Sequence, residues 1–83
     1  MKRQLLYVEW LDHSSEGADG RWVSKSQLDK AGPMTCHTIG WIYKEDKMSV
    51  TLVSTHGDEE DTDFGGDMTI IKSTIIKRKK VEL

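Results

Sequence analysis

The stretch "CHTIGWIY", Cys36 to Tyr43, has the two-residue alternation of side chains on which the predicted β fold is based. Its side chains alternate as in a β-strand, so Ile39 and Trp41 point to one side and Gly40 to the other. A glycine inside a strand marks either a sharp bend or the close approach of another backbone or a ligand, and the bend is the favoured interpretation here. Trp41 is predicted to be a core anchor.

Cys36 and His37 place a thiol beside an imidazole, which raises the question of nucleophilic catalysis. Neighbouring side chains on a strand face opposite sides of the sheet, so the two groups are not expected to meet. Cys36 is predicted to act as a small apolar residue. Together with His13 and His56, these residues also lack the paired spacing of a zinc site. We therefore expect no enzyme activity, no cofactor and no bound metal.

Alternating patterns on both sides of this stretch predict further short strands. Leu5–Leu11 is predicted to be a strand that is apolar on much of both faces. Residues 48–56 are predicted to form a hairpin with the strand that contains "CHTIGWIY", across a polar turn. "MTII" and "STIIKRKKVEL" give two more strands, with "KST" (residues 72–74) as a tight 3₁₀ turn between them.

One short helix is predicted between the first two strands, from Lys25 to Ala31. Ser24 and Gln27 form a capping box, and Gly32 followed by a proline suits the helix end.

These elements predict a mainly β fold over residues 1–83, a single domain of about five strands with one short helix after the first strand. Open edges would favour aggregation, so we expect a small, strongly bent antiparallel barrel of SH3-like or Sm-like type.

The bulk composition indicates what stabilises so small a domain. Of 83 residues, 36% are hydrophobic and 31% are charged, and one cysteine cannot form an internal disulfide. A homo-oligomer is the expected support. No apolar run approaches the roughly 18 residues of a membrane span, and the net charge of −2 gives no overall attraction to nucleic acid. We expect a cytoplasmic protein with no membrane partner and with neither DNA nor RNA as its main partner.

Two tryptophans in polar surroundings are candidates for ligand contact. An indole flanked by hydroxyls and cations suits a nucleobase that carries a phosphate. The alternative is that the indoles fill the core. The candidate residues are Trp10, Asp12, His13, Ser14, Arg21 and Trp22.

A second candidate group lies in the run "IIKSTIIKRKK", where Lys72, Ser73, Thr74 and Arg78 can donate hydrogen bonds to a phosphate. An equally weighted alternative is an edge strand that lysines protect from aggregation. The acidic segment 57–67 carries six carboxylates and is predicted to be a solvated loop rather than a calcium site, because the calcium-loop register is absent.

Four short pieces along the chain resemble a group of small phage-encoded proteins. They are "WLD" (Trp10–Asp12), Trp22, "TIGWI" (Thr38–Ile42) and "IIKSTIIK" (Ile70–Lys77). Some phage proteins of this size are oligomeric sponges that sequester the cyclic nucleotide signals of bacterial anti-phage systems such as CBASS or Thoeris without hydrolysing them. The resemblance implies a non-catalytic anti-defence protein in the cytoplasm of an infected bacterium, with a cyclic oligonucleotide as its ligand.

Two other functions stay open at the level of sequence. One is an SH3-like module that binds a host or phage protein. The other is a nucleic-acid-binding barrel, which the acidic segment and the negative net charge disfavour.

Overall fold

The protein is mainly β, and its principal element is one antiparallel sheet of five strands. The computed structural model describes residues 3–15, 17 and 19–83. The strand order is β6-β3-β2-β1-β7, and a separate two-stranded sheet pairs β4 with β5. The elements in chain order are β1 (Leu5–Asp12), α1 (Lys25–Lys30), β2 (Met34–Glu45), β3 (Ser49–Val53), β4 (Thr55–His56), β5 (Phe64–Gly65), β6 (Met68–Ile71), the 3₁₀ helix η1 (Lys72–Thr74) and β7 (Ile75–Val81).

The sheet is bent, because its two outer strands are consecutive in the chain. Only η1 separates β6 at one edge from β7 at the other, so these edges must approach each other at η1. β2 makes the bend possible: its first part pairs with β1 and its last part with β3, with Trp41 in both ladders. The predicted 3₁₀ turn at residues 72–74 is confirmed.

The core lies on the inner face of the bent sheet. Five fully buried side chains form it: Leu6, Val8, Val50, Leu52 and Ile70. Three partly buried side chains pack against them: Trp10, Ile42 and Ile75.

Gly40 faces this core and is buried, because β3 passes very close to it. A Cβ atom on Gly40 would lie 3.0 Å from the carbonyl oxygen of Val53 and 3.1 Å from Cβ of Leu52. Close backbone approach, the less favoured of the two sequence interpretations, is therefore what the structure shows at this glycine.

The prediction that Trp41 is a core anchor is wrong. Trp41 is in register with Leu5 and lies on the outer face, whereas Trp10 lies on the inner face. The period of two was correct, but the assignment of its two faces was inverted. The reason is packing space: close to the β3 backbone the inner face of β2 accommodates a glycine, not an indole.

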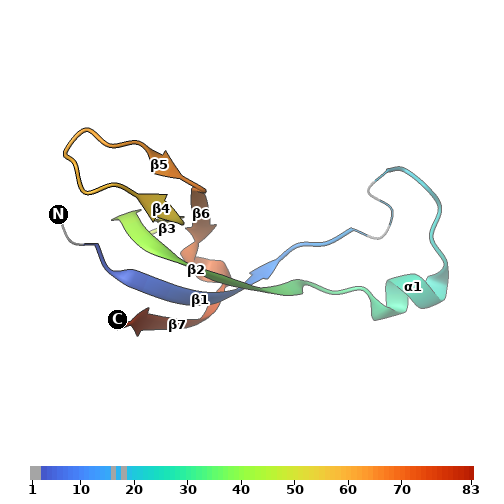
Figure 1. Ribbon diagram of the computed structural model, residues 1–83. Coiled ribbons are helices and arrows are strands. Elements are labelled where there is room, and N and C mark those ends of the chain that lie inside the picture. Colours follow the sequence, from blue (N-terminus) through green and yellow to red (C-terminus); the bar gives the residue numbers. More distant parts are fainter. Residues whose placement is uncertain (1–2, 16, 18) are drawn as a thin grey trace.

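The helix α1 stands apart from the sheet. β1 and β2 continue beyond the core as a two-stranded ribbon, and α1 lies at its far end (Figure 1), which gives the molecule extents of 53 × 24 × 24 Å. The capping box of Ser24 and Gln27 is present in full. The helix nevertheless ends at Lys30 with Ala31 in an extended conformation, and Gly32 does not adopt the left-handed geometry expected for a helix end. Pro33 disfavours a helical conformation for Gly32, the residue directly before it, so the helix could not have continued through this glycine.

We expect Trp10→Ala to lower the free energy of unfolding by about 2–3 kcal/mol, because a half-buried indole leaves the core. Trp41→Ala should cost less, about 1–2 kcal/mol, because its half-buried indole packs on His56 but lies outside the core cluster. Urea titration followed by circular dichroism measures both. An unfolded Trp41→Ala protein beside a stable Trp10→Ala protein would reverse the assignment of faces.

Candidate binding surfaces

The candidate ligand residues are distributed over three parts of the structure. Trp10 and Asp12 belong to the end of β1; His13, Ser14, Arg21 and Trp22 lie on the connection that leads to α1; and Lys72, Ser73, Thr74 and Arg78 belong to η1 and β7. The ladder pairs Trp10 with Ile75, so the first and third groups lie near each other. Arg21 and Trp22 lie just before Val23 and the cap residue Ser24 of α1, which stands apart from the sheet, and they do not join these two groups.

The indole of Trp10 packs in the interior of the protein. Besides packing on the core, its Nε1–H donates to the hydroxyl of Thr38 over 2.9 Å. The indole therefore stabilises the sheet from within. Asp12, the last residue of β1, is in register with Met34 and half-buried.

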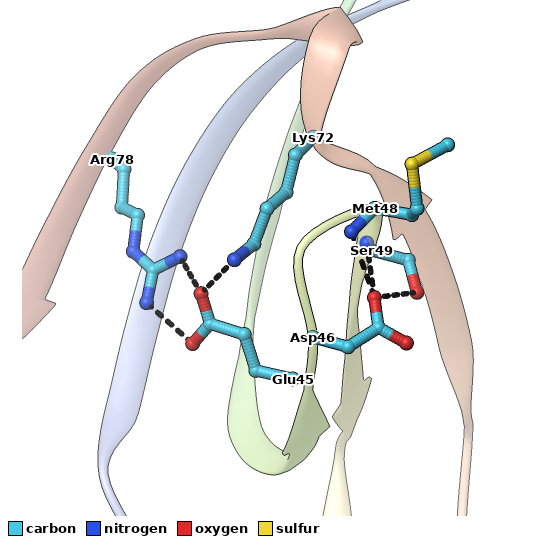
Figure 2. Close-up of polar contacts among 6 residues, drawn as sticks. All are labelled: Glu45, Asp46, Met48, Ser49, Lys72 and Arg78. Carbon is cyan, nitrogen blue, oxygen red and sulfur yellow. Dashed lines mark hydrogen bonds and ion pairs between the residues drawn. The ribbon is translucent and has the colours of Figure 1, made fainter.

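Lys72 and Arg78 converge on one carboxylate, that of Glu45 at the end of β2 (Figure 2). Arg78 donates through both terminal nitrogens, with N–O distances of 2.6 and 2.9 Å, and Nζ of Lys72 lies 2.7 Å from Oε2. The hydrogen bonds from Arg78 and then Lys72 lower the pKa of Glu45 to about 2, and the same carboxylate raises the pKa of Arg78. The two cations expected to bind a phosphate thus bind a carboxylate of the protein itself.

This Glu45 cluster (Glu45, Lys72 and Arg78) connects three elements across the bend: β2, η1 and β7. The hydroxyl of Thr74 donates to the carbonyl of Ile71 over 2.6 Å. It therefore stabilises the 3₁₀ turn. Ser73 is exposed.

Beside the cluster, Asp46 shapes the turn between β2 and β3. Its Oδ1 accepts from the backbone N–H groups of Met48 and Ser49 at 2.8 and 2.9 Å (Figure 2). These two bonds lower the pKa of Asp46. The turn that presents Glu45 to its two cations is therefore fixed locally.

The projecting segment is rich in exposed apolar side chains. We call residues 19–34 the arm. Trp22 is 99% exposed, Leu28 and Met34 are more than half exposed, and α1 contains no buried residue. Near the base of the arm, the hydroxyl of Ser14 donates to the carbonyl of Gly32 over 2.6 Å, while His13 is exposed. Arg21 makes an ion pair with Asp19 at 3.6 Å.

Sequence reasoning missed a further surface, the outer face of β7, β1 and β2. The register places Lys79, Tyr7 and Ile39 in one row and Lys77, Glu9 and His37 in the next. The Tyr7 hydroxyl donates to Glu9 over 2.8 Å and lies 2.8 Å from Nδ1 of His37, so it accepts from the imidazole. The bond to Glu9 raises the pKa of Tyr7. Glu9 was the available signal, because a charge on one face of a strand identifies the solvent side.

The structure also bears on the thiol and imidazole of the opening stretch. Cys36 is in register with Trp10 and His37 with Glu9, so the two side chains occupy opposite faces as predicted. Within residues 3–15, 17 and 19–83, no group of three or more histidine, cysteine, aspartate or glutamate residues could hold a metal ion. No helix of this described part has the length and apolar character needed to cross a membrane.

We expect Glu45→Gln to lower the free energy of unfolding at pH 7 by about 1 kcal/mol, because it leaves two cations without their carboxylate. The folded-state pKa of about 2 lies below the ordinary value of 4.5, so this contribution is complete above pH 4.5 and declines as the pH falls toward 2. Urea titrations of both proteins between pH 2 and 7 should therefore converge at the acid end. A difference that stays constant over this range would contradict the assignment.

Comparison with protein-family models, with curated proteins and with solved structures finds no match for this chain. Its function is therefore inferred from the surfaces described above.

Proposed function

We propose that this protein is a non-catalytic interaction module that binds another protein through its arm. The observation that carries the proposal is Trp22, an indole that is 99% exposed on a segment remote from the core. Leaving an indole in water forgoes about 2 kcal/mol or more of burial free energy, and tryptophan is the residue type most enriched at the centres of protein interfaces.

The form of the arm supports the same function. α1 has six residues and none of them is buried, and a helix so short is not stable on its own in water. Its capping box fixes the start of the helix, and Leu28 and Met34 add exposed apolar area beside the indole. A partner that covers these side chains would supply the packing that the sheet does not provide.

The domain that carries the arm is, in this proposal, a small SH3-like or Sm-like barrel. The three-residue connection between the edge strands and the Glu45 cluster across the bend support closure of the sheet. Such a barrel is a compact base from which an arm can be presented.

We expect Trp22→Ala to change the stability by less than about 0.5 kcal/mol, since the indole has no packing to lose. It should weaken binding of the partner by at least tenfold, or about 1.4 kcal/mol. The tagged full chain is used to capture proteins from lysate of the source cells, and affinity for any stoichiometric partner is then measured with purified components. Met48→Ala is the matched control, because Met48 is 71% exposed but lies outside the arm. Equal losses in both variants, or no stoichiometric partner, would refute the proposal.

A second proposal follows from the resemblance to phage sponges: a homo-oligomer that sequesters a cyclic oligonucleotide in the cytoplasm of an infected bacterium. The observation that favours it is again the exposed indole of Trp22, since an indole can stack on a base.

For a sponge we expect nanomolar affinity, about −12 kcal/mol, for at least one cyclic di- or trinucleotide. Calorimetry against a panel of these compounds measures it, mass under native conditions gives the number of subunits, and heat denaturation should release the ligand intact. No binding across the panel removes this proposal and leaves the protein-binding proposal unaffected.

A further inference from the structure

A cavity of about 830 Å³ lies at the end of the sheet opposite the arm. Its apolar wall is the row Val81, Leu5 and Trp41, which are neighbours across β7, β1 and β2 on the outer face. The cavity is open to solvent, and its volume is ample for one long side chain. Neither the core nor the proposed function of the arm uses this cavity.

Two aromatic rings form a corner of the cavity. The rings of Trp41 and His56 are 5.3 Å apart and nearly perpendicular, at 86°. The orientation of the imidazole is supported by a 3.0 Å contact between its Nδ1 and the carbonyl of Gly57. Such a corner offers π-electron density to a flat or cationic group.

The charges around this corner are predominantly negative. Asp58 and Glu82 line the cavity. A smaller neighbouring cavity of about 320 Å³ shares His56 and Asp58 with it and adds Glu59 and Glu60. Two carboxylates therefore line the cavity of the aromatic corner, and two more line its neighbour.

Among the described residues, Arg3 is the one cation that lines both cavities, and its guanidinium has partners within the protein. Nη1 of Arg3 donates to the carbonyls of Ile42 and Tyr43 at 3.3 and 3.1 Å. The guanidinium carbon also lies 4.9 Å from the ring centre of Tyr43 and 5.1 Å from that of Phe64. Among the described lining residues the carboxylates outnumber this one guanidinium, which favours a cationic ligand over a phosphate.

We propose that this cavity binds an arginine or lysine side chain from a basic segment of a partner protein. The cationic head would lie against Trp41, and Asp58 and Glu82 would neutralise it. Arginine should be preferred, because a planar, weakly hydrated guanidinium stacks on an indole better than an ammonium does. The inference rests on the protein-binding function proposed above, but it assigns a second surface and the chemistry of its partner.

The probes are three octapeptides in which serine alternates with arginine, with lysine or with glutamine. Each is titrated into the full chain while the indole N–H resonance of Trp41 is followed by NMR, at about 50 and 300 mM salt. We expect the arginine peptide to bind most tightly, the lysine peptide about threefold more weakly and the glutamine peptide not at all. Higher salt should weaken binding of both cationic peptides.

Charge variants locate the site. The double variant Asp58→Asn with Glu82→Gln should bind the arginine peptide about fivefold or more weakly. The matched control removes two carboxylates elsewhere, Asp29→Asn with Asp67→Asn, and should change the affinity less than twofold; both residues are exposed and outside the cavity. Trp41→Leu should also weaken binding. Should that variant fail to fold, the charge variants alone decide.

Three results would overturn the proposal: equal binding of the glutamine peptide, equal losses in the two charge variants, or a concentration-dependent doubling of mass that Asp58→Asn with Glu82→Gln abolishes. The last result would make the occupant a second copy of this chain, whose β7 carries Lys77, Lys79 and Lys80.

Trp22→Ala separates this inference from the proposed function, because it should leave peptide binding unchanged. If the protein captures a partner through Trp22 but does not bind the basic peptides, only the proposal for the cavity is refuted. If the protein binds the peptides but has no partner that depends on Trp22, only the proposal of partner binding through the arm is refuted.

Discussion

The three residues of η1 impose the main constraint on this fold. They must connect β6 and β7, which are the opposite edges of a five-stranded sheet, so the sheet has to bend and bring the two edges near each other at η1. The bend creates an enclosed inner face, and the core of Leu6, Val8 and Val50 fills it. The Glu45 cluster then joins β2 to both sides of the connection.

The bend also assigns a role to each tryptophan. At Gly40 the backbone of β3 leaves no room for a side chain, so the indole of Trp41 next to it lies on the outer face. Trp10, on the inner face of β1, fills the space near η1 instead and is held by Thr38. Trp22 belongs to neither face. The three indoles therefore represent three environments: the interior, the wall of a cavity and solvent.

Much of the architecture could be predicted from the sequence, because alternation and capping are local. The strands, the 3₁₀ turn and the capping box of Ser24 were recognised from spacing alone. The inner and outer faces of β2 could not be assigned in this way, since Ile39 and Ile42 give both faces apolar character. The short pairing of β4 with β5 was also missed, because Phe64 stands among the charges of the acidic segment.

The candidate sites were harder to predict, for an electrostatic reason. Lys72 and Arg78 have the composition of a phosphate site, but Glu45, which is 33 residues before Arg78, already neutralises them. No local pattern reveals such a partner. The cavity at Trp41 likewise combines β1, β2, β4 and β7, and only the folded register brings them together.

The projection of the arm has a consequence for the order of events when two molecules meet. The radius of gyration is 16.6 Å, whereas a compact chain of this length has about 12 Å. The excess comes from the ribbon and α1, which sweep a larger volume than the sheet does as the molecule tumbles. In the protein-binding proposal, the exposed indole of Trp22 on this projecting segment is therefore the part of the molecule that a partner would contact first.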